Sequence, residues 1–198
     1  MIGLVLGETQ FGKIILRRLK ELKKRYIIMD ISKKNIFKKD RNSHQLSIGQ
    51  LGKALSLLKK NNCKQVIFAG RVSRPNFAKA KFDFQALYYL PKIIKASKKG
   101  DTYIIKEIIR IFNKKKIKII KQNFFNPELT LKKGIYTITK PDAINKKDII
   151  LGKKVIRRLK KNNVGQGVVI INNQIIEIED IKGTDFMLLG LNKVYKKI

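Results

Sequence analysis

Residues 2–12 read IGLVLGETQFG, and this stretch predicts the opening of an α/β sheet. The apolar run 2–6 is typical of a strand that is buried on both faces of a parallel sheet. Residues 7–12 are expected to form a turn, which leads into a helix over 13–25. Ile15, Leu19 and Leu22 share one face of that helix, as in an amphipathic helix. Strand, turn and helix in this order begin a βαβ unit.

The same alternation continues along the chain. Buried strands are predicted at 26–30 (YIIMD), 65–69 (QVIFA) and 117–120, and helices at 49–61, 83–98 and 101–113, while 31–46 reads as irregular. This order favours an open parallel sheet, which binds ligands beyond the carboxyl ends of its strands. We expect these ends at residues 7–12, 30–32, 70–75 and 122–130.

A turn-rich connector over 121–141 separates this part from a second segment, and we place the boundary near 138–142. The predicted organisation is a Rossmann-like parallel-sheet domain over 1–138 and a smaller, incomplete α+β domain over 142–198. In the second domain we expect a helix after Asp142, a hairpin of strands 167–171 and 175–178, and a polar turn over 180–185. A segment of about 57 residues buries little core by itself.

Composition limits the chemistry. The chain has 46 Lys and Arg against 14 Asp and Glu, a formal net charge of +32. Its 37 Lys and 32 Ile against 7 Ala fit AT-rich coding, so the charge is either compositional or attracts a polyanion. We find no nucleic-acid-binding motif and expect no nucleic-acid partner. A single Cys and a single His exclude an internal disulfide and a Cys/His zinc site.

We expect neither a membrane-spanning helix nor a signal peptide. No apolar run reaches the ~18 residues of a membrane helix. Residues 1–12 also lack the basic start of a signal peptide. We therefore expect a reduced, cytoplasmic protein.

The loop GRVSRP (70–75) is the strongest anion-binding candidate. Arg71, Ser73 and Arg74 follow a predicted strand, and guanidinium groups form forked hydrogen bonds to phosphate oxygens. The alternative is an ordinary basic loop in a basic protein. The 7–12 turn is a weaker phosphate candidate, because it does not match G-x-G-x-x-G and Glu8 would repel phosphate.

Three further places carry candidate site residues. Asp101 follows Lys-Lys-Gly and is expected to be a helix N-cap or a ligand. Asp185, in Gly-Thr-Asp, is the best metal candidate, with a turn or helix cap as the alternative. Gln166 and Gly167 suggest a close approach of backbone to a ligand, and we add Thr184 as a ligand contact.

Five motifs occur in the order and spacing of one family: GQLGK (49–53), FAGRVSRP (68–75), KGD (99–101), GQGVV (165–169) and E-x-x-x-G-T-D-x-M-L (179–188). The chain resembles UDP-2,3-diacylglucosamine pyrophosphatases of the LpxI type. The resemblance runs from Met1 to about Leu188.

The resemblance implies a metal-dependent hydrolase of lipid A biosynthesis in Gram-negative bacteria. Such an enzyme cleaves the pyrophosphate of UDP-2,3-diacylglucosamine to UMP and 2,3-diacylglucosamine 1-phosphate (lipid X) with Mg²⁺ or Mn²⁺. It also implies a homodimer as one oligomeric state, and a lipid-bearing substrate fits a peripheral location on the anionic inner membrane. On the matching positions we expect Arg71, Ser73, Arg74, Gln166, Gly167 and Thr184 to bind substrate, and Asp101 and Asp185 to bind metal.

Two departures from the family leave other functions open. The first turn, which is rich in glycine in the family, reads Gly7-Glu8-Thr9-Gln10 here. The family continues beyond the position of Ile198 with an Asp-x-Pro-x-x-Gly stretch that includes its expected catalytic carboxylate. We therefore assign no catalytic residue, and the chain as written could be inactive. The alternative is a non-catalytic module that binds a nucleotide-sugar or a polyanion. A nicotinamide oxidoreductase, with Asp30 as the ribose-binding acid, is a distant third.

Overall fold

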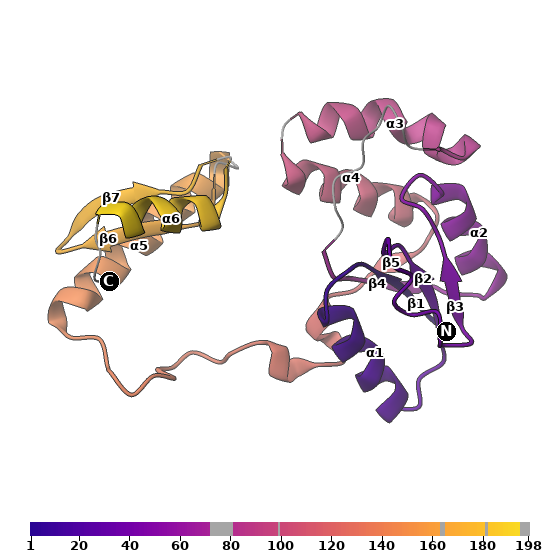
Figure 1. Cartoon of the computed structure of the whole chain (residues 1–198), viewed down its shortest axis with the longest axis horizontal. Helices are drawn as coiled ribbons and strands as arrows, with labels where there is room; N and C mark the ends of the chain where they lie inside the picture. The colour runs from indigo at the N-terminus through magenta and orange to yellow at the C-terminus, as the bar shows by residue number, and fades with distance from the viewer. Residues whose placement is uncertain (72–80, 99, 163–164, 181, 195–198) are drawn as a thin grey trace. The chain divides into compact units, whose positions relative to one another are not determined.

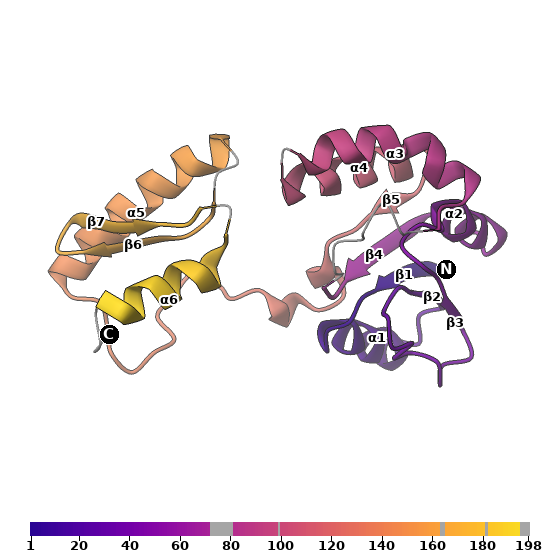
Figure 2. The same cartoon turned by 45° about the horizontal axis from the view of Figure 1, so that its top comes forward.

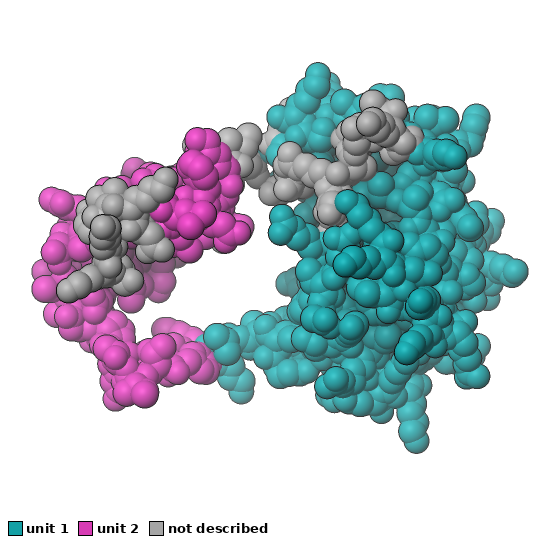
Figure 3. Space-filling view, in the orientation of Figure 1, with its two compact units in different colours: residues 1–132 teal, residues 133–198 magenta. Residues whose placement is uncertain are grey.

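The computed structural model describes residues 1–71, 81–98, 100–162, 165–180 and 182–194. The chain divides into two compact units, Met1–Lys132 and Lys133–Ile198, which Figure 3 shows in teal and magenta. This division falls within the connector predicted at 121–141, ahead of the boundary that we placed near 138–142. No helix among the described residues is both long and apolar enough to cross a membrane.

The first unit contains a five-stranded sheet in the order β3-β2-β1-β4-β5 (Figures 1 and 2). Every neighbouring pair is parallel, which confirms the predicted α/β class. The order matches the first five positions of doubly wound sheets. The strands are β1 Ile2–Leu6, β2 Tyr26–Asp30, β3 Ser43–Gln45, β4 Gln65–Ala69 and β5 Lys118–Ile119.

Successive residues of a strand point to opposite sides of the sheet. Because the central strands are mostly apolar along their length, both faces of the sheet are apolar, and helices cover both. On one side, Leu4 and Leu6 of β1 pack in a cluster with Leu19 of α1. On the other side, Val5 packs in a second cluster with Leu58 of α2 and with residues of α3 and α4. The helices are α1 Phe11–Glu21, α2 Leu51–Lys60, α3 Phe84–Ser97 and α4 Asp101–Lys114.

Two strands differ from the sequence prediction. Residues 31–46 were expected to be irregular, yet Ser43–Gln45 pairs with β2 as strand β3. Ser-His-Gln carries no apolar alternation, so its backbone pairing leaves no trace in the sequence pattern. The strand predicted at 117–120 shortens to Lys118–Ile119.

The GQLGK motif (49–53) joins two helices. The Asp83 carboxylate accepts hydrogen bonds from the Ala86 N–H at the start of α3 (2.9 Å) and from the Lys53 N–H at the start of α2 (3.0 Å). A Cβ at Gly52 would lie 3.1 Å from both Asp83 oxygens, and one at Gly49 would overlap the Lys81 carbonyl oxygen. The glycines of this motif therefore serve packing within the first unit.

We expect Asp83→Ala to destabilise the first unit by about 1–2 kcal/mol, because it removes a side-chain acceptor from two helix starts. Asp83→Asn should lose less, since the amide oxygen can still accept one of the two hydrogen bonds. Urea unfolding of both variants beside the parent measures the difference. Equal losses in the two variants would contradict this double-capping role.

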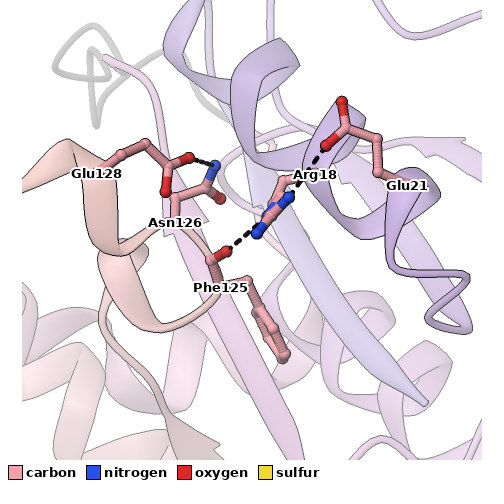
Figure 4. A network of polar contacts seen from close by, with 5 residues as sticks. All are labelled: Arg18, Glu21, Phe125, Asn126 and Glu128. Atoms are coloured by element: carbon pink, nitrogen blue, oxygen red, sulfur yellow. Dashed lines mark hydrogen bonds and ion pairs between the residues drawn. The ribbon is translucent and has the colours of Figure 1, made fainter.

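The start of the connector is fastened to α1. Arg18 Nε donates to the Phe125 carbonyl oxygen (3.0 Å), and Arg18 Nη1 donates to Glu21 Oε2 (3.3 Å) (Figure 4). The side chain of Asn126, which is buried, donates to Glu128 Oε1 (2.8 Å). Hydrogen bonds from the Glu128 backbone and from Asn126 lower the pKa of the Glu128 carboxyl. The short helices η1 Gln122–Phe124 and η2 Pro127–Leu129 lie on either side of this contact.

The second unit consists of α5 Ala143–Asn162, β6 Val168–Ile171, β7 Gln174–Ile178 and α6 Thr184–Val194. The strands pair antiparallel, which confirms the predicted hairpin. Asn172 and Asn173 both have positive φ (51° and 63°), as a type I′ turn requires. Helix α6 was not predicted: residues 180–185 were expected to be a polar turn, but the helix begins at Thr184.

Candidate functional site

One candidate site, in the first unit, lies where β1 and β4 end side by side. The Gly7 N–H donates to the Ala69 carbonyl oxygen, and the Glu8 N–H donates to the Arg71 carbonyl oxygen, each at 2.9 Å. Gly70 has φ 91°, and a Cβ there would lie 3.1 Å from the Gly7 backbone nitrogen. The strand order reverses between β1 and β4, and open sheets bind ligands at such a reversal.

The basic loop begins at this edge. The side chain of Arg71 is exposed directly after β4. Ser73 and Arg74 lie outside the described residues, so phosphate recognition by this loop stays a prediction.

The 7–12 turn presents a poor surface to phosphate. The Glu8 N–H already donates to Arg71, and Glu8 Oε1 accepts the Lys33 N–H at 3.4 Å. The carboxylate therefore lies on the turn itself, where it opposes an anion.

Asp101 is the first residue of α4 and is not the helix N-cap, which was one of the two roles expected for it; the ligand role stays a prediction. Gly100, with φ 115°, is the N-cap, and the structure does not describe the Asp101 side chain. Helix α4 leads into β5, whose first residue is Lys118, so α4 runs antiparallel to the strands (Figure 2). Asp101 is therefore at the side of the sheet where the strands end, the same side as Arg71.

The Asp30 side chain has a structural role. It is fully buried, and its Oδ1 accepts the N–H and the hydroxyl of Ser32 at 2.9 and 2.6 Å. Its Oδ2 accepts the Phe37 N–H at 2.9 Å. Both carboxylate oxygens hold the loop after β2, which argues against the ribose-binding role that an oxidoreductase would need.

A separate candidate site, in the second unit, is centred on Glu179, which is buried (6% exposed) at the end of β7. Glu179 Oε2 accepts the Gln166 N–H at 2.9 Å, and Oε1 accepts the Thr184 hydroxyl at 3.0 Å. The Glu179 N–H donates to the Gly167 carbonyl oxygen at 3.0 Å. Three residues predicted from the sequence, Gln166, Gly167 and Thr184, thus meet at one carboxylate that the prediction did not include.

Glycines allow this close contact. Gly165 has φ 71°, and a Cβ there would overlap the Glu179 carbonyl oxygen. A Cβ at Gly167 would lie 3.0 Å from Glu179 Oε2 and 3.3 Å from the Met187 methyl carbon. The two glycines therefore do mark a close backbone approach, as the sequence predicted. Among the described residues, the group that the backbone approaches is Glu179.

The second metal candidate, Asp185, is exposed in the first turn of α6. Among the described residues, no three His, Cys, Asp or Glu side chains gather as a metal site. Mg²⁺ is often held by one or two carboxylates together with substrate phosphates, and one exposed carboxylate suits that role.

Sequence reasoning missed Glu179 as a functional candidate, although a signal existed. Glu179 opens the E-x-x-x-G-T-D motif, and acidic residues are few in this chain. Its distance of five residues from Thr184 gave no hint of contact, because the predicted polar turn over 180–185 did not show that the two side chains come together. The Gly183 N–H donates to the Asp180 carbonyl oxygen at 3.1 Å.

Both units match models of known protein domains. Residues 1–129 match the LpxI N-terminal domain, and residues 132–197 match the LpxI C-terminal domain. A curated relative, the UDP-2,3-diacylglucosamine pyrophosphatase LpxI of Caulobacter vibrioides, is 32% identical over 143 residues, which are 72% of this chain and 51% of the relative. The chain thus spans about half the length of that relative. With both of its units matched in order, the chain belongs to the LpxI family.

Proposed function

We propose that this protein acts on UDP-2,3-diacylglucosamine and hydrolyses its pyrophosphate to UMP and 2,3-diacylglucosamine 1-phosphate. The observation that carries the proposal is the match of both units, in order, to the two LpxI domains. The name of the Caulobacter relative supplies the substrate. This step would place the protein in lipid A biosynthesis.

We propose different roles for the candidate residues of the two units. The exposed guanidinium of Arg71, at the β1/β4 reversal, would bind phosphate oxygens together with Ser73 and Arg74. In the second unit, Glu179 would act as a positioning residue, because it holds the Gly165–Gly167 loop and Thr184 in a fixed geometry. We propose Gln166, Gly167 and Thr184 as the substrate contacts of that loop.

A divalent cation is part of the proposal. Mg²⁺ or Mn²⁺ would neutralise pyrophosphate charge, with Asp101 and Asp185 as the proposed protein ligands. Because Mg²⁺ is often held by one or two carboxylates together with substrate phosphates, we expect weak binding of the cation alone and stronger binding in the presence of the nucleotide-sugar.

The direct test is a hydrolysis assay on the full chain. Purified protein receives UDP-2,3-diacylglucosamine in detergent with Mn²⁺ or Mg²⁺, and mass spectrometry follows UMP and the sugar 1-phosphate. Turnover that EDTA abolishes would support the proposed reaction. Folded protein that binds the substrate without turnover would instead favour the alternative, a nucleotide-sugar binding module.

We expect Asp185→Asn to weaken metal-dependent substrate binding by about tenfold or more, because it removes an anionic oxygen ligand. Isothermal titration with substrate, with and without Mn²⁺, measures the effect. Glu177→Gln is the matched control, since Glu177 is an exposed carboxylate of the same unit on β7. If both variants bind like the parent, Asp185 does not belong to the site.

A further inference from the structure

Helix α3 has two apolar faces, and only one of them packs on the first unit. Ala86 and Tyr89 are buried, and Ile93 packs against the core cluster on that side of the sheet. The opposite face is in solvent: Phe84 is 88% exposed, Tyr88 69% and Leu87 51%. Large side chains exposed to this degree on one helix face usually mark a binding surface.

The exposed face continues along the helix as a shallow groove. The groove is lined by Leu87, Leu90, Pro91, Ile94, Lys95 and Lys98. Together with Phe84 and Tyr88 these residues form one stripe, because they recur at three- and four-residue intervals. We call this stripe the α3 outer face.

The charges of α3 are all of one sign. Lys92, Lys95 and Lys98 are exposed, and residues 84–98 contain no Asp or Glu. The aromatic side chains lie near the start of the helix and the lysines in its second half. Lysine can lay its alkyl stem along an apolar surface while its ammonium group contacts an anion.

We propose that the α3 outer face docks on the surface of an anionic lipid bilayer. Aromatic and aliphatic side chains on one face, flanked by lysines, are the pattern of helices that lie in a membrane interface. Anionic headgroups attract the lysines while the apolar side chains enter the acyl boundary. The inference goes beyond the proposed hydrolysis and does not depend on it.

The same charges disfavour two other occupants. A second copy of this chain, paired through the same face, would bring two sets of lysines together without an acidic partner on α3. A nucleic acid would satisfy the lysines and could stack bases on the aromatic rings, but it would leave the aliphatic side chains of the groove without an apolar partner. An anionic bilayer meets both demands.

The test is co-sedimentation of the full chain with vesicles of phosphatidylcholine, with and without phosphatidylglycerol. No substrate is present, so failure here is separate from failure of the hydrolysis assay, which uses detergent. We expect the parent to bind the anionic vesicles. The double variant Phe84→Ala with Tyr88→Ala should bind these vesicles at least about tenfold more weakly, because it removes apolar area from the interface.

Matched controls separate this face from general charge and hydrophobicity. Leu131→Ala with Ile138→Ala removes two other exposed apolar side chains and should bind like the parent. Lys95→Gln with Lys98→Gln should weaken binding more than Lys59→Gln with Lys60→Gln on α2, which removes the same charge. Alanine favours helix, so circular dichroism should show that the α3 variants keep their fold.

Three results would overturn the proposal. The parent could remain in the supernatant with anionic vesicles. The α3 variants could bind as well as the parent, which would leave the binding to net charge alone. Light scattering could show a dimer that the Phe84→Ala with Tyr88→Ala variant converts to a monomer, which would identify a second copy as the occupant.

Discussion

Replacing Gly165 with alanine is expected to destabilise the second unit strongly. Gly165 has φ 71°, a conformation that costs a residue with a Cβ about 1–2 kcal/mol. The added Cβ would also overlap the Glu179 carbonyl oxygen, which belongs to the backbone and cannot rotate away. Overpacking of this kind adds about 1–3 kcal/mol.

Gly183→Ala is the control that separates these two costs. Gly183 also has positive φ (90°), but among the described residues other than its two chain neighbours, no atom lies within 4 Å of where its Cβ would be. Hydrogen exchange of the β6 and β7 amides in the full chain reports the opening free energy of this unit for both variants. We expect the larger loss of protection for Gly165→Ala. Equal losses would mean that strain in φ is the whole effect.

Replacing Glu179 with alanine should disrupt the same region by a different route. The variant leaves the Gln166 N–H and the Thr184 hydroxyl without their acceptor. Hydrogen bonds to a charged group contribute about 1.5–3 kcal/mol each. We therefore expect a large loss of stability, and Glu177→Ala, which removes an exposed carboxylate from β7, should cost much less.

Glu179→Gln distinguishes geometry from charge. Its amide oxygen can accept the Gln166 N–H, and its amide nitrogen can donate to Thr184, because a hydroxyl can reverse its role. We expect Gln to restore most of the stability that Ala loses, as measured by urea unfolding. A Gln variant as unstable as the Ala variant would show that the negative charge itself is required.

The strands with strong apolar patterns could be predicted from the sequence to the residue. Segments 2–6, 26–30 and 65–69 form β1, β2 and β4 with those bounds, because strands covered on both faces need continuous apolar runs. Strand β3 could not be predicted, since its Ser-His-Gln sequence has no apolar alternation. Helix α6 was missed because its start looks like the end of a turn.

The candidate site was predictable in part. Glycine spacing located Gln166 and Gly167, and the motif located Thr184, but neither showed that all three meet at Glu179. That meeting depends on the hairpin, which carries the chain from Gly167 back to Glu179 through a turn at Asn172 and Asn173. Sequence patterns report local conformation well, whereas contacts across a hairpin depend on register.

The short outer strands of the first unit affect how the protein behaves at high concentration. A sheet edge with unpaired backbone groups can recruit a strand from another molecule, especially when the edge is long and apolar. Here the outer strands are β3, three residues long and without an aliphatic side chain, and β5, two residues long and beginning with an exposed lysine. The long apolar strands β1, β2 and β4 lie between them. This order keeps the apolar strands of the first unit away from edge-to-edge pairing.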